Sequence, residues 1–205
     1  MEEHTRAYLR GRFGDHYRRI DLDGPPDAHA REWGYIPWTE GPDTTMVHHR
    51  SLYDLGTLDA FLERERPRHV YYSAGRYDAP GAGTMSAKGW QNSDLVFDLD
   101  ADHLPTVTPG EDDYDEMLRQ CKEQLLRLID FLEDDFGFED LSIVFSGGRG
   151  YHVHVRDDDV LSLESEQRRE IVDYIRGTGI EIDALVETEM VGGSAGRTSP
   201  APKRT

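Results

Sequence analysis

The stretch LSIVFSGGRGYHVHVR (residues 141–156) contains two short runs rich in β-branched and aromatic residues, separated by a turn with three glycines. Such runs are typical of β-strands, and a glycine-rich connection between two of them favours a hairpin. We therefore expect strands at 141–146 and 151–156. Side chains two residues apart share one face of a strand, so His152 and His154 lie together and the residues between them face the other way.

The turn of this hairpin carries groups that bind phosphate. Its glycines allow backbone N–H groups to approach a ligand closely. Arg149 offers a planar guanidinium and Ser146 a hydroxyl donor, with His152 following on the next strand. We interpret the stretch as a phosphate cradle beside a strand-borne histidine. A plain glycine-rich hairpin with surface histidines is the alternative.

A second unusual stretch lies upstream, where SDLVFDLDADHLP (residues 93–105) places carboxylates on an apolar strand. The period of two puts Asp98 and Asp100 on one face, with Asp102 continuing the row if the strand extends that far. Two adjacent carboxylates stay ionised only with a compensating cation. Mg²⁺ is often held by one or two carboxylates plus substrate phosphates, so the pattern predicts a metal site for phosphoryl transfer. A solvated edge of an acidic protein is the alternative.

The composition is strongly acidic: 41 Asp and Glu stand against 23 Lys and Arg among 205 residues, for a formal net charge of −18. A hydrophobic content of 37% and clear periodic segments favour a folded domain with a carboxylate-rich surface, as expected in a salt-rich cytosol. The single cysteine, Cys121, excludes an internal disulfide. No apolar run reaches the ~18 residues of a membrane span and the first residues are no secretory signal, so we expect a cytoplasmic protein that does not contact membranes.

Periodicity and breaker residues predict the remaining elements. Helices are expected at 3–20, 54–65, 112–136 and 164–177, and further strands at 46–51, 69–74 and 93–100, while residues 31–38 form a short strand or an aromatic-rich loop. The Gly-, Ser- and Pro-rich end predicts a disordered tail over 191–205, after one domain over 1–190.

The motifs Asp98-Leu99-Asp100 and Ser146-Gly-Gly-Arg-Gly-Tyr-His152, in this order, resemble the DxD and SGxRGxH motifs of the catalytic (small) subunit of archaeal–eukaryotic DNA primase. The flanking segments REWGYIPW, HVYYSA and MSAKGW resemble that family as well. With three lysines in all and abundant acid, the chain resembles a haloarchaeal member.

The resemblance implies an α+β primase small-subunit fold with mixed β-sheets flanked by helices, here C-terminally incomplete. It implies synthesis of short RNA primers from nucleoside triphosphates on a single-stranded DNA template, for DNA replication, in a heterodimer with the large primase subunit. Asp98 and Asp100 would be catalytic and would bind two Mg²⁺ or Mn²⁺ ions. The residues implied in nucleotide binding are Ser146, Arg149, His152, Lys88 and Arg31.

The chain departs from the family in three respects, one of which is His48 where the family has an arginine, in the strand expected at 46–51. The family has a third metal-binding aspartate well downstream, whereas the only late aspartate here is Asp183, in an unrelated context. The stretch after DxD has His103 and then Cys121 alone, so we expect no structural zinc. A truncated, non-catalytic module that binds nucleotide and metal, or the large subunit, is therefore the alternative function. For nucleic acid, six arginines are expected to line a basic groove: Arg64, Arg66, Arg68, Arg76, Arg149 and Arg156.

Overall fold

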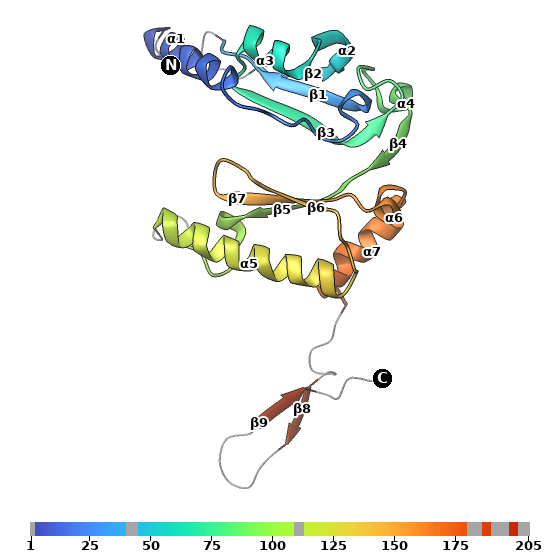
Figure 1. Ribbon diagram of the computed structural model, residues 1–205. Coiled ribbons are helices and arrows are strands. Elements are labelled where there is room, and N and C mark those ends of the chain that lie inside the picture. The colour runs from blue at the N-terminus through green and yellow to red at the C-terminus, as the bar shows by residue number, and fades with distance from the viewer. Residues whose placement is uncertain (1–2, 40–44, 109–112, 180–185, 190–196, 201–205) are drawn as a thin grey trace. The chain divides into compact units, whose positions relative to one another are not determined.

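The computed structural model describes residues 3–39, 45–108, 113–179, 186–189 and 197–200. The fold is α+β, with sheets flanked by helices, as predicted (Figure 1); the pairings of the described strands are antiparallel and not mixed. The chain divides into two compact units, residues 1–163 and 164–205, so the boundary falls before the helix expected at 164–177 and not near residue 190. Each unit is described by itself.

The first sheet has four antiparallel strands in the order β2-β1-β3-β4. The strands are β1 Arg31–Ile36, β2 Val47–Arg50, β3 His69–Tyr77 and β4 Trp90–Ser93. The first three confirm the predicted strands. The short helix α4 (Met85–Lys88) and β4 have too few residues to show a periodic signal, and the sequence did not indicate them.

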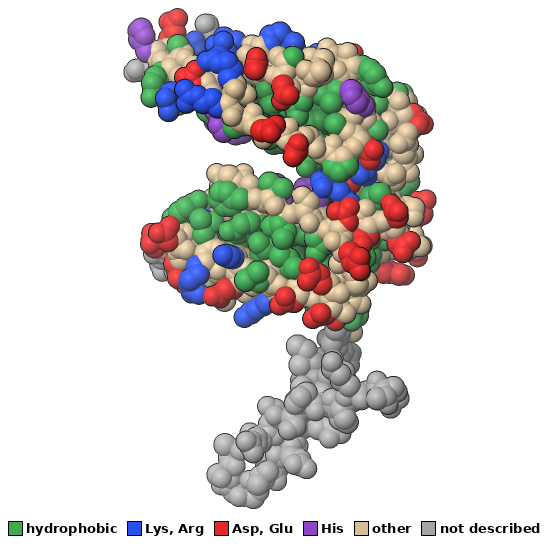
Figure 2. All heavy atoms as spheres, viewed as in Figure 1, with side chains coloured by type: hydrophobic (Ala, Val, Ile, Leu, Met, Phe, Trp, Pro, Cys, Tyr) green, Lys and Arg blue, Asp and Glu red, His purple; other side chains and the backbone are tan. Residues whose placement is uncertain are grey.

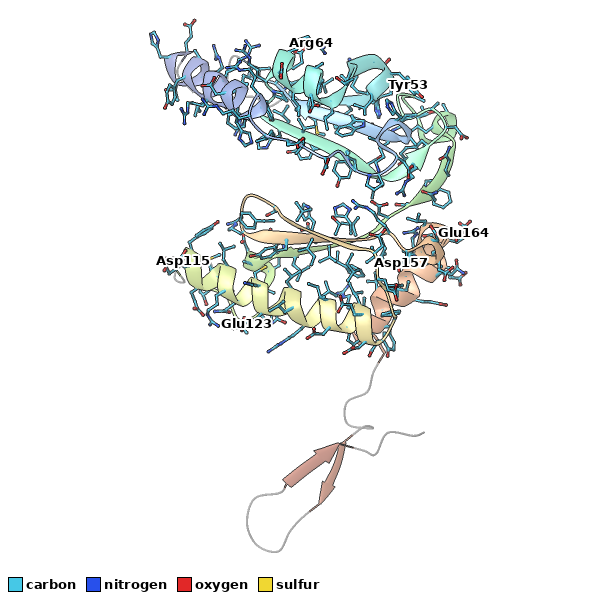
Figure 3. All side chains as sticks on the ribbon, in the orientation of Figure 1. Tyr53, Arg64, Asp115, Glu123, Asp157 and Glu164 are labelled. Atoms are coloured by element: carbon cyan, nitrogen blue, oxygen red, sulfur yellow. The ribbon has the colours of Figure 1, made fainter. Side chains whose placement is uncertain are left out.

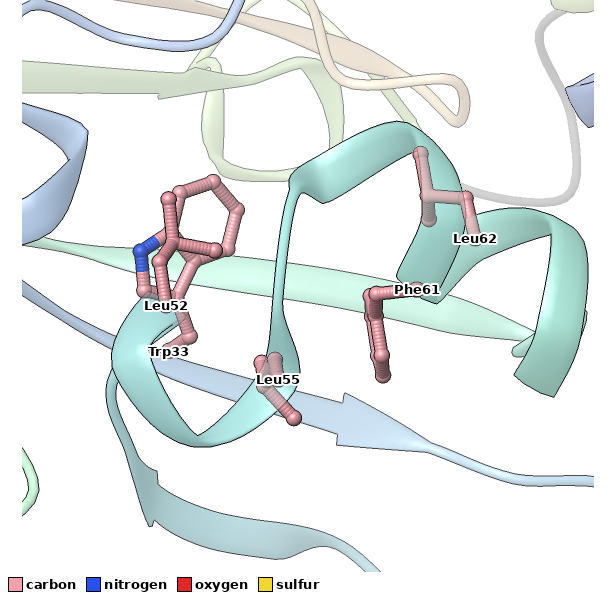
Figure 4. Packing of buried hydrophobic residues seen from close by; sticks show 5 residues of the cluster. All are labelled: Trp33, Leu52, Leu55, Phe61 and Leu62. Carbon is pink, nitrogen blue, oxygen red and sulfur yellow. The ribbon is translucent and has the colours of Figure 1, made fainter.

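Three helices accompany this sheet: α1 (Glu3–Tyr17), α2 (Leu52–Leu55) and α3 (Leu58–Glu65). The core they form with it holds five buried side chains, drawn in Figure 4: Trp33, Leu52, Leu55, Phe61 and Leu62. The single helix predicted over 54–65 is wrong, because Gly56 adopts φ 89° and separates α2 from α3. Ser51 and Thr57 each accept a backbone hydrogen bond as N-caps, which lets both short helices begin independently.

The second sheet has three antiparallel strands in the order β5-β7-β6, namely β5 Leu95–Asp100, β6 Leu141–Phe145 and β7 Gly150–Val155. The predicted hairpin is confirmed as β6–β7. Helix α5 (Tyr114–Asp134) covers one face through residues at three- and four-residue steps, and the short α6 (Asp158–Leu161) follows β7 (Figure 1). Acidic side chains are spread over the surface in view in Figure 2.

The second unit contains α7 (Ser165–Ile175) and a two-stranded antiparallel sheet of β8 (Val186–Glu189) and β9 (Arg197–Pro200). Helix α7 confirms the predicted helix. Within the tail expected over 191–205, residues 197–200 form β9, and the rest lies outside the described residues, as does Asp183. No helix in the described part of the chain has the length and apolar character needed to cross a membrane.

Candidate active site

The pairing of β5 with β7 builds one face of the second sheet from the predicted site residues. Asp98 lies directly opposite His152, and Asp100 opposite Gly150. The imidazole Nε2 of His152 is 3.2 Å from the carboxylate Oδ1 of Asp98. The Asp98 side chain is 72% exposed and that of His152 41% exposed. The prediction that Asp98 and Asp100 share a face is confirmed, and β5 carries Asp98 at little desolvation cost because its carboxylate remains in water.

The opposite face of the same strands is core. Val153 and Val155 are fully buried, and Leu99 packs against a cluster that includes Cys121 of α5. Burial raises the pKa of the Cys121 thiol, and the negative charges of Asp100 and Asp98 raise it further. The thiol thus stays protonated beneath the strand, where it points to the Leu99 carbonyl at 3.8 Å.

The row of aspartates ends where β5 ends. Asp102 lies in the 3₁₀ turn Ala101–His103 and not on the strand, so it does not continue the row. Its Oδ2 forms an ion pair with Arg149 at 2.6 Å, while its Oδ1 is buried without a hydrogen-bond partner. Arg149, expected to bind phosphate, is therefore tied to Asp102, although about half of its side chain remains exposed.

The glycine-rich turn is held by its own hydroxyl. The Ser146 Oγ accepts from the backbone N–H groups of Gly148 (3.4 Å) and Gly150 (3.2 Å). Tyr114 of α5 donates to the Gly148 carbonyl at 2.8 Å. Because Ser146 acts as acceptor in these contacts, its hydroxyl hydrogen can still donate to an anion.

Lys88 lies beside the first sheet and does not contact the glycine-rich turn through any hydrogen bond or ion pair found among the described residues. Its side chain is 3% exposed and forms an ion pair with Glu32 of β1, next to His49. Burial alone would raise the pKa of Glu32, but hydrogen bonds from Lys88 and from the His49 backbone outweigh it and hold this pKa below its ordinary value. The sequence did not single out Glu32 or His49, and Glu32 was discoverable only as the neighbour of Arg31.

Arg31 is fully buried, and its guanidinium has no donor left for a nucleotide. It donates to the carbonyls of Pro26, Ser73 and Ala74 and to both carboxylate oxygens of Asp94, the latter at 3.0 Å each. These five hydrogen bonds use all five N–H groups. The structure therefore gives Arg31 a structural place in the core of the first unit, in contrast to the nucleotide-binding role implied by the resemblance.

Asp94 is the centre of a buried charge cluster that the sequence did not reveal. It lies between β4 and β5, where the chain passes from the first sheet to the second. Besides Arg31, it pairs with Arg76 (2.9 Å) and Arg156 (3.2 Å), and the His154 Nδ1 lies 3.5 Å away. We call Asp94, Arg31, Arg76 and Arg156 the Asp94 cluster; it joins β1 and β3 of the first sheet to the residue that follows β7.

One exposed and one half-buried carboxylate with a neighbouring imidazole suit a hard divalent cation that keeps water or phosphate oxygens as further ligands. Asp98 and Asp100 supply oxygen donors on one accessible face, so these residues fit Mg²⁺ or Mn²⁺. Within the described ranges, however, no group of three or more His, Cys, Asp or Glu side chains is arranged to hold a metal ion. A metal ion bound to Asp98 and Asp100 would therefore need oxygen atoms of water or of a bound phosphate to complete its coordination sphere.

Comparison with known proteins gives the same family that the DxD and SGxRGxH motifs resemble. The sequence profile described as DNA primase small subunit matches residues 97–191, a range that includes β5 and the glycine-rich turn. The DNA primase small subunit PriS of Haloarcula marismortui is 69% identical over 205 residues, which cover 100% of this chain and 52% of that protein. PriS of Methanococcoides burtonii is 45% identical over 198 residues, covering 96% and 50%. The chain spans about half the length of the curated relatives it matches.

Proposed function

We propose that this chain is the part of a primase catalytic subunit that binds divalent metal and nucleoside triphosphate, because over its whole length it is 69% identical to a DNA primase small subunit. In the whole subunit this site would join nucleoside triphosphates into short RNA primers on a single-stranded DNA template. The large primase subunit is the expected partner.

One observation supports the proposal above others: Asp98 and His152 face each other across the β5–β7 ladder at 3.2 Å, next to the glycine-rich turn at 146–150. Asp98 and Asp100 would hold Mg²⁺ or Mn²⁺. When bound, such ions activate an attacking hydroxyl and neutralise charge on the leaving pyrophosphate.

The chain's own residues bind and orient the triphosphate. His152 donates from a ring N–H, and the hydroxyl of Ser146 donates from the turn. Arg149 must give up part of its contact with Asp102 to reach phosphate. That exchange is feasible because Arg149 is half exposed, and it would free the carboxylate of Asp102 as well.

Replacement of His152 tests the triphosphate site. We expect His152→Ala to weaken ATP binding in Mn²⁺ and concentrated KCl about ten- to a hundredfold, because a hydrogen bond to a charged group contributes about 1.5–3 kcal/mol. Isothermal titration calorimetry measures this affinity. His4→Ala, at an exposed histidine of α1, is the matched control and should bind like wild type. Unchanged affinity in His152→Ala would contradict the proposed site.

A second candidate function is a module that binds nucleotide and metal without polymerising. It is favoured by the absence of a third carboxylate beside Asp98 and Asp100 among the described residues. Primer synthesis by the whole small subunit, but not by this chain, would be consistent with this second function for the 205 residues alone. Synthesis by the 205-residue chain would exclude it.

A further inference from the structure

The face of the second sheet that carries Asp98 and His152 continues into a cleft. A cavity of about 510 Å³ is lined on one side by His152, His154 and Val144, and on the other by residues 69–72 of β3. Because Val144 pairs with His152, and Asp98 also pairs with His152, these side chains share one face. His152 therefore belongs both to the proposed active site and to the cleft.

The cleft extends beyond the reach of a single nucleotide. A second cavity of about 400 Å³ shares Val70, Tyr72 and Val144 with the first and continues to the loop at residues 22–26 and to Arg156. An incoming nucleoside triphosphate needs only the space next to His152. Two joined cavities that lead away from the proposed active site suit a polymer instead.

Rings supply much of the cleft wall. His69 and Tyr71 stack on each other with ring centroids 6.1 Å apart and planes at 21°, and Tyr72 stacks on His154 at 6.0 Å and 29°. Tyr71 is 44% exposed and His69 is also exposed, so each can take up a further planar group. Burial, and then the charge of Arg68, lower the pKa of His69 and favour its neutral ring.

The cleft is not lined by a row of basic side chains that could follow a phosphate backbone. Among the described residues that line the first cavity, none is acidic, and none is lysine or arginine. Of the arginines expected to form a basic groove, Arg76 and Arg156 are in the Asp94 cluster and Arg149 pairs with Asp102. Arg64 pairs with Glu65. In concentrated salt, phosphate contacts would in any case be strongly weakened.

We propose that the cleft between β3 and the β6–β7 hairpin binds single-stranded DNA by stacking its bases on the exposed rings of Tyr71 and His69, with little contribution from phosphate contacts. The proposal rests on the proposed primase function for the identity of the strand, which is the template. Stacking suits it because every base has a π face, so a template of any sequence can be bound. Stacking also survives the salt concentration in which a protein of net charge −18 is expected to work.

Fluorescence anisotropy with a labelled 20-nucleotide oligo(dT), in EDTA and at several KCl concentrations, tests the proposal. We expect Tyr71→Ala and His69→Ala each to weaken binding about tenfold, because stacking contributes about 1–3 kcal/mol per base. Tyr71→Phe keeps the ring and should restore wild-type affinity. Tyr53→Ala, at an exposed tyrosine of α2 labelled in Figure 3, is the matched control and should leave it unchanged.

The salt dependence gives a second readout. A plot of log Kd against log [KCl] should have the shallow slope expected for about one phosphate contact. A protein that follows the phosphate backbone makes roughly six to ten such contacts and shows a much steeper slope. A steep slope, unchanged affinity in the double variant Tyr71→Ala/His69→Ala, or no binding of the oligonucleotide by wild type would each overturn the proposal.

Photocrosslinking keeps the test independent of how the variants fold. An oligonucleotide with 5-iododeoxyuridine should label wild-type protein at residues 69–72, and labelling only elsewhere would overturn the proposal. Manganese–ATP binding by wild type separates this proposal from the proposed function. If ATP binds and the cleft is not labelled, only the proposal that the cleft binds single-stranded DNA is contradicted. If the cleft is labelled and ATP does not bind, the proposed function is contradicted.

Discussion

Asp94→Ala is expected to destabilise the protein by about 3–5 kcal/mol, the usual cost of leaving buried charges without their partner. The Asp94 side chain is fully buried, as is that of Arg31, and Arg76 is 4% exposed. Removal of the single carboxylate would leave three guanidinium groups together in the interior, with Arg76 still bound to the exposed Asp27 and to the Asn92 side chain. Because the cluster joins β1 and β3 to the residue that follows β7, its loss should also loosen the connection from β4 to β5.

Chemical denaturation in concentrated KCl measures this loss as a lower free energy of unfolding. Asp115→Ala removes an exposed aspartate from the first turn of α5 (Figure 3) and should cost less than about 1 kcal/mol. Equal stability of Asp94→Ala and Asp115→Ala would show that the cluster does not stabilise the fold.

The same cluster predicts a dependence on pH. Burial alone would raise the pKa of Asp94, but its contacts with His154 and Arg31 and the charge of Arg76 outweigh this and hold the pKa far below its ordinary value. A lowered pKa in the folded state means that the stabilisation is present above about pH 4, where an unfolded aspartate is ionised, and is lost progressively below it. The difference in stability between wild type and Asp94→Asn should therefore shrink as the pH falls below about 4.

Gly150→Ala is expected to cost at least about 3 kcal/mol, at the upper end of the range for overpacking. A Cβ atom at Gly150 would overlap the backbone carbonyl of Leu99, which cannot rotate away as a flexible side chain would. Gly150 pairs with Asp100, so the strands must separate at the end of the ladder where the aspartates lie. ATP affinity should fall together with stability.

Gly148→Ala is the matched control within the same turn. The nearest atom to a Cβ there is the Ser146 Oγ at 3.8 Å, an ordinary contact. We expect it to stay within about 0.5 kcal/mol of wild type in thermal or chemical unfolding. If Gly150→Ala were equally harmless, the close approach of β5 to the turn would be wrong.

The second sheet was largely predictable from the sequence, and the reason is the period of two. Alternation alone placed Asp98 with Asp100 and His152 with His154, and the antiparallel pairing then brought Asp98 to His152. The end of β5 was not predictable, because Asp102 continues the same alternation although the chain turns at Ala101–His103.

The Asp94 cluster left no comparable signal. Its arginines stand far from Asp94 along the chain, and ion pairs between distant segments produce no periodicity. Arg31 and Lys88 look like free cations in the sequence, whereas the structure commits them to Asp94 and Glu32. The split of the predicted 54–65 helix depends on one φ angle at Gly56, which the apolar pattern of the helix conceals.

Asp98 and Asp100 form the metal-binding part of the proposed site, and Mn²⁺ binding tests this most directly. The EPR signal of free Mn²⁺ should fall on titration with wild-type protein and ATP in concentrated KCl. Asp21→Ala/Asp23→Ala, a control pair of exposed aspartates with the same spacing, should behave like wild type. The account predicts that Asp98→Ala/Asp100→Ala leaves the signal at the level of ATP alone. Equal binding of Mn²⁺ by this variant and wild type would contradict it.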